Sequence, residues 1–386
     1  MTGSRKTRRS FLAGLGGIAL GSAASPLISA RQDYKPVSAR HNLHIKGDVY
    51  QHGDATYEQS RINSVWQAIK PGRFPELIVT ANTEADVIAT VQYARRHGLQ
   101  IAVRGGGHNY IASYLRDGGI MLNVSNLREI KVDANARKVY VQPGVNGTEF
   151  SSILAEYGLA FPVAHGPSVA IGGYLLGGGM GWNGEHWNHF ACFNVDAIDV
   201  ITAAGEKLTI SRDSHTDLFW AARGAGPAFC GIVTGYHLRV FPLPQAITAS
   251  TYIFSIDQIA KVSAWIEQAR LRQDSKIELS FILESEGDEK QCVLSAVCFA
   301  DDKEESTSLL DTLLHDIPDQ DRLFTRENHP MSFSEVLALT RTSIPVRLAN
   351  ETAWTNKPAE ALDKIVQHYL RAPAGKTVVI ANYRRH

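Results

Sequence analysis

The clearest helical periodicity in the first half of the chain begins at Thr83. Apolar residues then recur along one face at helical spacing, at Val87, Ile88, Val91 and Ala94. Thr83 is followed three residues later by Asp86, which is typical of a capping box, and Gly98 is the residue type that ends helices in the left-handed conformation. The pattern predicts a helix from Thr83 to Gly98.

Short apolar runs bounded by turn residues predict strands around this helix and beyond it. The expected strands span residues 99–103, 120–124, 139–142, 195–203 and 232–241, and a second helix spans 148–157 and ends at Gly158. The first strand runs directly into the glycine loop of residues 104–109. Residues 31–64 are polar and mixed, and predict a leader segment made of a strand and a loop.

Pro242 and Pro244 mark a boundary after which the pattern changes. A strand is expected at 248–254, then a helix capped by Ser255 and Gln258 with Ile259, Val262, Ile266 and Ala269 facing inward. Two strands at 277–284 and 292–299 and a helix at 303–314 follow. This order favours an α+β domain in which helices cover one face of a largely antiparallel sheet.

Composition and charge narrow the possibilities. The 386 residues, 44% hydrophobic and 20% charged, suit a globular protein of two or three domains. The 39 basic and 39 acidic residues balance, so the basic footprint of a nucleic-acid-binding protein is missing and no nucleic-acid partner is expected. The four cysteines have no metal-type spacing and are expected to be ordinary buried thiols: Cys192, Cys230, Cys292 and Cys298.

The N-terminus predicts export. The residues Thr7-Arg8-Arg9-Ser10-Phe11-Leu12 precede a weakly hydrophobic stretch, rich in Gly and Ala, that runs to about Ala30. This is typical of a twin-arginine signal peptide over residues 1–30. The alternative is a transmembrane anchor, but glycines and Pro26 interrupt a span that is only about as long as a bilayer requires. We therefore expect the twin-arginine export machinery as a partner, a periplasmic or secreted location and no stable membrane anchor.

Two glycine-dense segments, at residues 104–109 and 172–184, carry the candidate chemistry. Glycine suits places where the backbone approaches something closely, and a row of unhindered amides can bind an anion such as a pyrophosphate. The alternative is a pair of tight structural turns. A GxGxxG pattern at Gly179–Gly184 follows other glycines and no strand, so it does not predict a Rossmann nucleotide site.

Several ordered motifs between Pro75 and Pro244 resemble the FAD-binding domain, of the PCMH type, found in the vanillyl-alcohol-oxidase and berberine-bridge-enzyme family. They are RGGGHNY at 104–110, GPSVAIGGYLLGGGMGW at 166–182, DLFWAARGAGPAFCGIVT at 217–234 and GIVTGYHLRVFPLP at 231–244. The resemblance implies an α+β protein with an FAD-binding domain at 65–244 and a substrate domain at 245–386, after the signal peptide (1–30) and the leader (31–64).

The resemblance also implies which residues contact the cofactor. The loop from Arg104 to Asn109 would wrap the FAD diphosphate, the second glycine segment would pass close to the cofactor, and Ile232 and Val233 would lie beside the adenine. The expected cofactor-binding residues are Arg104, Gly105, Gly106, Gly107, His108, Asn109, Gly166, Ser168, Gly172, Gly173, Gly177, Gly178, Ile232 and Val233.

His108 matches the family histidine whose ring nitrogen bonds the flavin 8α carbon, so a single covalent link is expected. The alternative is that His108 only hydrogen-bonds the cofactor or the loop. Gly166 stands where some members carry a second attachment cysteine, so a bicovalent flavin is not expected. His165 either faces the flavin ring or is a loop histidine without a chemical role.

No metal site is expected. His186 and His189 lie close together, but no carboxylate or cysteine accompanies them at ligand spacing. The two histidines are better interpreted as residues of a solvated loop or a substrate entrance.

The expected reaction is oxidation of a small alcohol, sugar or aromatic amine by hydride transfer to flavin, with oxygen or a redox partner as the electron acceptor. No catalytic base can be assigned from the sequence. Relatives usually continue into a Tyr-rich segment that closes the active site, whereas the sequence given ends shortly after Asn382 and Tyr383. The alternative function is therefore a truncated accessory protein that binds flavin but is catalytically deficient.

Overall fold

The structure is a computed structural model that describes residues 43–286, 288–319, 321–339, 352–373 and 377–383. All of them belong to one compact unit, Ser38–His386. The predicted signal peptide at 1–30 lies outside the described residues.

The first sheet combines three parallel strands with one antiparallel edge strand. Its order is β1 (Asp48–Gln51), β2 (Leu77–Thr80), β4 (Ile120–Asn123) and β3 (Ile101–Arg104), with β1 antiparallel to β2. The helices α2 (Tyr57–Asn63) and α3 (Glu84–His97) accompany it. The predicted capping box of α3 is present, and Gly98 ends the helix with a φ of 64°.

The second sheet is antiparallel throughout. Its order is β5 (Ile130–Asp133), β6 (Lys138–Val141), β10 (Ile232–Arg239), β8 (Val195–Ile201) and β9 (Lys207–Ser211). The other elements of this region are α4 (Gly147–Glu156), α5 (Ile171–Leu176), α6 (Thr216–Ala221), the 3₁₀ turns η1 (Ala191–Asn194) and η2 (Gly226–Ala228), and the strand pair β7 (Leu159–Ala160) and β11 (Phe241–Pro242).

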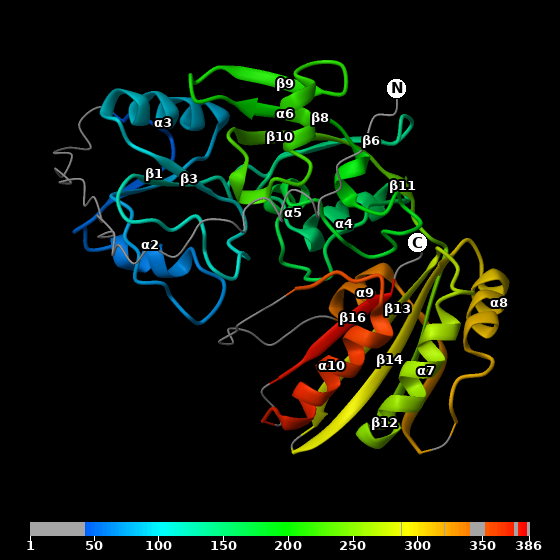
Figure 1. Ribbon diagram of the computed structural model, residues 1–386. Helices are drawn as coiled ribbons and strands as arrows, with labels where there is room; N and C mark the ends of the chain where they lie inside the picture. Colours follow the sequence, from blue (N-terminus) through cyan, green and yellow to red (C-terminus); the bar gives the residue numbers. More distant parts are fainter. Residues whose placement is uncertain (1–42, 287, 320, 340–351, 374–376, 384–386) are drawn as a thin grey trace, which may run out of the picture. The chain divides into compact units, whose positions relative to one another are not determined.

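The third sheet begins after the predicted boundary and is also antiparallel (Figure 1). Its order is β15 (Arg322–Met331), β12 (Ala246–Ser255), β14 (Glu289–Ala300), β13 (Ile277–Glu286) and β16 (Val379–Tyr383). Its helical elements are η3 (Ile256–Gln258), α7 (Ile259–Ala269), α8 (Lys303–Leu314), α9 (Phe333–Ala338) and α10 (Pro358–Arg371). Because α7, α8 and α10 share a hydrophobic core with one face of the sheet, the predicted α+β fold class is confirmed.

The two faces of this third sheet pack differently. Along β13, Leu279 and Phe281 turn into the core beneath the helices, so the alternate residue Glu278 points to the opposite face. Glu278 pairs with Val297 across the strands, and Val297 and Phe299 belong to the hydrophobic cluster of the second sheet. The face that carries Glu278 therefore packs against residues of the second sheet and its neighbouring elements.

Three expectations need correction. The leader region contains the strand β1, which pairs with β2. It also contains the helix α2, where only a loop was expected. Neither Ser255 nor Gln258 caps α7 through its side chain, because the turn η3 precedes the helix there. Cys230 is exposed, whereas the other three thiols are buried.

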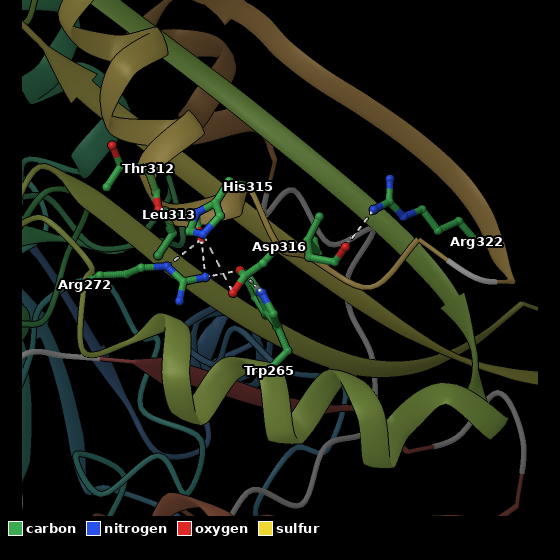
Figure 2. A network of polar contacts seen from close by, with 8 residues as sticks. Trp265, Arg272, Thr312, Leu313, His315, Asp316 and Arg322 are labelled. Atoms are coloured by element: carbon green, nitrogen blue, oxygen red, sulfur yellow. Dashed lines mark hydrogen bonds and ion pairs between the residues drawn. The ribbon is translucent and has the colours of Figure 1, made fainter.

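A polar network ties α7 to the segment after α8 (Figure 2). Trp265 Nε1 donates to Asp316 Oδ1 at 2.7 Å, and the Arg272 guanidinium donates to the same carboxylate and, at 3.1 Å, to the Leu313 carbonyl. Burial alone would raise the pKa of Asp316, but the hydrogen bond from Trp265 and the charge of Arg272 hold it below its usual value. The network stabilises the helical layer.

Candidate functional site

The two glycine segments meet at the end of β3. A Cβ added at Gly106 would lie 2.7 Å from the Ala170 Cβ and 3.0 Å from the Ala170 backbone nitrogen, distances that leave no room for a side chain. A Cβ on Gly105 would lie 3.9 Å from the Gly173 nitrogen. Glycine at 106 therefore lets the first loop lie directly against the residue that precedes α5.

The glycines of the second segment have different roles. A Cβ at Gly172 would meet Pro143 at 2.7 Å, so this glycine is needed for packing within the protein. Gly178 has a φ of 101°, a conformation that side chains rarely adopt, and a Cβ on Gly177 would lie 3.4 Å from the Gly173 carbonyl. At Gly173 no described atom lies within 4 Å of an added Cβ. Gly173 is thus the position that leaves space for a ligand.

His108 is held as a neutral imidazole. Its ring lies 4.8 Å, centroid to centroid, from the ring of Trp66, and it forms a hydrogen bond with the backbone of Ser168. Burial, and then the charge of Arg104, lower the pKa of His108 to about 4. At neutral pH the ring therefore keeps a nitrogen lone pair, as a nucleophile requires.

Arg104 uses its guanidinium to shape the loop. It donates to the Ser64 carbonyl at 3.2 Å, to Asn123 Oδ1 at 3.1 Å and to the Gly106 carbonyl at 3.3 Å. The Tyr114 hydroxyl is within hydrogen-bond distance of two backbone carbonyls, those of Ser64 and, at 3.1 Å, of Gly107. Tyr114 and Trp66 are site residues that the sequence did not reveal, because each is separated from the motif it supports and carries no motif of its own.

The remaining expected residues lie around this meeting point or on β10. Asn109 is exposed and accepts a hydrogen bond from the Ser113 amide at 3.1 Å. Ser168 is exposed and Gly166 is half-buried. Ile232 and Val233 are buried and belong to the hydrophobic clusters of the first and second sheets respectively. Contact between any of these residues and a cofactor stays a prediction.

The residues present fit FAD. The glycine loop (residues 104–109) lies against the start of α5, and Gly173 leaves space beside this loop. The loop contains the neutral imidazole of His108. In addition, Trp182 Nε1 and both polar side-chain atoms of Asn183 are buried without a hydrogen-bond partner among the described residues. Buried polar atoms of this kind normally have partners, so a bound polar group would complete them.

The other motifs that the sequence offers are the GxGxxG stretch at Gly179–Gly184 and the histidines His186 and His189. The GxGxxG stretch at Gly179–Gly184 lies in an irregular loop and not between a strand and a helix. His186 Nδ1 lies 3.2 Å from the Ser275 hydroxyl. Within the described ranges, no group of three or more His, Cys, Asp or Glu residues could hold a metal ion. No helix there has the length and apolar character of a membrane span.

Comparisons with known proteins support an FAD-binding domain in this part of the chain. Residues 75–211 match the family model of the FAD binding domain. The FAD-linked oxidoreductase nodO of Hypoxylon pulicicidum is 32% identical over 264 residues, which cover 68% of this chain and 58% of that protein. The (R)-6-hydroxynicotine oxidase of Paenarthrobacter nicotinovorans is 32% identical over 220 residues, or 56% and 47% of the two chains.

A solved structure shows the same fold. The crystal structure of 6-hydroxy-D-nicotine oxidase from Arthrobacter nicotinovorans superposes with a TM-score of 0.69 at 25% identity, covering 78% of this chain and 65% of that one. Fold and site thus define a flavoprotein with a PCMH-type FAD-binding domain. The resemblance to the vanillyl-alcohol-oxidase and berberine-bridge-enzyme family is confirmed. The chain spans about half the length of the curated relatives it matches.

Proposed function

We propose that this chain is an FAD-dependent oxidoreductase that oxidises a small alcohol, sugar or aromatic amine. The observation that carries the proposal is the close approach of Gly106 to Ala170 beside the open position at Gly173. Bound FAD would supply the redox chemistry by accepting a hydride equivalent from a substrate carbon. Among the relatives, the one named (R)-6-hydroxynicotine oxidase supports the aromatic amine.

The chain's own contribution begins with His108, which we propose bonds the flavin covalently. Its depressed pKa keeps the imidazole neutral, and Trp66 and Ser168 hold the ring in one orientation. Arg104 keeps the loop in shape through its three hydrogen bonds to neighbouring groups. A single link is proposed because Gly166 cannot serve as a second attachment residue.

The substrate would lie over the face of the third sheet that carries Glu278. Next to Glu278 on this face, the Ser280 hydroxyl donates to Asn382 Oδ1 at 2.7 Å, across the paired strands β13 and β16. These half-buried polar groups offer hydrogen bonds to a polar substrate. Asn382 lies on β16, the strand that pairs with β13 in the third sheet.

The proposed location is the periplasm or the exterior of the cell, reached through the twin-arginine machinery. The support is the pair Arg8 and Arg9 before a weakly hydrophobic stretch. Cell fractionation of the wild type and of the Arg8→Lys, Arg9→Lys double variant tests this. The wild type should reach the periplasm and the double variant should remain inside. Equal distribution of the two would contradict the proposal.

The catalytic proposal is tested by anaerobic mixing of the purified flavin-containing protein with benzyl alcohol, glucose or benzylamine. Bleaching of the flavin absorbance by one of them identifies the substrate class, and admission of air then shows whether oxygen restores the colour. A flavin that none of the three bleaches would favour the alternative, a flavin-binding accessory protein. That alternative stays open because the chain matches only part of each curated relative.

A further inference from the structure

His165 and Glu278 form a polar pair although 113 positions separate them in the sequence. His165 Nε2 is hydrogen-bonded to Glu278 Oε1. His165 stands one residue before Gly166 in the cofactor domain, and Glu278 stands on β13 of the third sheet. The side chain of Glu278 is only 3% exposed, so the pair places a carboxylate deep between the two segments.

The His165 segment is the same stretch that meets the cofactor loop. Ser168, three residues after His165, forms the backbone hydrogen bond with the His108 ring. Two residues further on, Ala170 packs against Gly106. The pair therefore lies at the side of the candidate cofactor site where the third sheet reaches it.

One oxygen of this buried carboxylate has no partner in the described part of the chain. Glu278 Oε2 is buried and has no hydrogen-bond partner among the described residues. The ring of Trp182 lies 4.4 Å from the His165 ring, centroid to centroid, and its Nε1 is likewise buried without a described acceptor. An unpaired acceptor and an unpaired donor around one histidine form a position that a small polar ligand would complete.

The carboxylate of Asp86, which has a purely structural role, accepts more hydrogen bonds than the carboxylate of Glu278. Asp86, which is also buried, accepts from the Lys46 amide with Oδ1 and from the Asn82 and Thr83 amides with Oδ2. Both of its oxygens are used, as expected for a group whose task is to hold the fold. Glu278 differs in keeping one oxygen available at the candidate cofactor site.

We propose that Glu278, positioned by His165, contacts the substrate and accepts an N–H or O–H hydrogen from it; this inference rests on the proposed function. When the substrate carbon is oxidised, its C–H bond would break, and the hydrogen would leave with both bonding electrons as a hydride that bound flavin would accept. The proton of the adjacent O–H or N–H passes to the Glu278–His165 pair. A C=O or C=N bond remains in the product, and the charges balance.

The test compares Glu278→Gln with Glu284→Gln in the full-length, flavin-containing protein. Glu284 is the matched control because it lies on the same strand and accepts a hydrogen bond from Gln291 Nε2 at 3.2 Å. Three quantities are measured: flavin content, the midpoint of thermal unfolding, and the rate of anaerobic flavin bleaching across pH. The probe is whichever of benzylamine, benzyl alcohol or glucose bleaches the wild type.

Glu278→Gln should keep its flavin and unfold within about 2 °C of the wild type, or above it, because glutamine can keep the oxygen that binds His165 and the unpaired Oε2 adds no stability. Its bleaching rate should fall at least about 100-fold, with loss of the acid limb of the pH profile. His165→Asn, which removes only the positioning ring, should lower the rate by about 10-fold. Glu284→Gln should match the wild type in all three measurements.

Three outcomes would overturn the inference. An unfolding midpoint lowered by about 6 °C or more in Glu278→Gln would make the pair a structural bridge. Loss of flavin would place Glu278 against the cofactor, and an unchanged bleaching rate would remove it from the reaction. If no probe bleaches the wild type, the proposed function fails separately. An unchanged or raised unfolding midpoint would then still support a ligand position at Glu278.

Discussion

Two polar clusters in this protein are each built around a tryptophan, and they differ in whether their hydrogen bonds are complete. In the cluster of Figure 2, Trp265 Nε1 and the Arg272 guanidinium both donate to Asp316. In the cluster around His165, neither Trp182 Nε1 nor Glu278 Oε2 has a partner among the described residues. The complete network is typical of groups that hold the fold, whereas the incomplete one is the observation behind the ligand position proposed at Glu278.

Gly106 and Gly173 show a similar contrast, between filled and open space. The space beside Gly106 is filled by Ala170, and the space beside Gly173 is left open by the described atoms. One glycine therefore holds two segments together and the other leaves room next to them. Substitutions at Gly106 and Gly173 should therefore have different effects.

The largest effect is expected from Gly106→Val. Its side chain would collide with Ala170, whose backbone nitrogen lies 3.0 Å from an added Cβ, so the loop and α5 must separate. The flavin-to-protein ratio of the purified variant should fall by about 10-fold or more. Gly72→Ala is the control, because no described atom lies within 4 Å of its added Cβ. A full flavin complement in Gly106→Val would contradict the proposed meeting of the two segments.

A smaller effect is expected from the titration of His108 in flavin-free protein. Its folded-state pKa of about 4 lies below the ordinary value of 6.5, so the unfolded chain binds the proton first. The free energy of unfolding should therefore fall as pH drops from 6.5 towards 4, by up to about 3 kcal/mol, with no contribution from His108 above that window.

Urea unfolding at several pH values measures this dependence. His108→Gln should remove it, and the exposed His315→Gln should keep it. The same slope in wild type and His108→Gln would show that His108 is not held neutral.

Asp316→Ala is expected to cost about 1 kcal/mol of unfolding free energy, because the partly buried indole N–H of Trp265 loses its acceptor. Flavin content should not change, since the network ties α7 to the segment after α8 and touches no expected cofactor residue. Urea unfolding and flavin absorbance are measured on the same preparation. A parallel loss of flavin would mean that the complete network also supports the cofactor site.

The smallest effect on stability is expected from Gly173→Ala. Alanine has a higher helix propensity than glycine, so the flavin-free protein should gain up to about 1 kcal/mol, since α5 has room for the methyl group. Flavin affinity should nevertheless fall, because the methyl group enters the open space. Titration of flavin-free protein with FAD measures the affinity. Unchanged affinity would place the cofactor elsewhere.

Local features of the fold could be predicted from the sequence. The capping box at Thr83 and the glycine at 98 fix the ends of α3 almost to the residue, and the alternating runs predict β13 and β14. The helix α2 was missed because Thr56 makes no side-chain cap and no apolar stripe marks the helix.

The site could be predicted only in part. The glycine motifs and His108 are local signals, but the contact of Gly106 with Ala170 depends on how distant segments pack. Glu278 has no signal in the sequence at all, because its partner His165 is 113 positions away and strand alternation alone does not separate a solvent face from an interface.

The most direct test of the central claim is acid precipitation of the purified protein, followed by absorbance and fluorescence measurements on the washed pellet, with His108→Ala alongside. We predict a yellow, fluorescent wild-type pellet and a colourless His108→Ala pellet whose FAD appears in the supernatant. Release of the flavin from both proteins would contradict the covalent link at His108, and a wild-type protein purified without flavin would contradict the cofactor site itself.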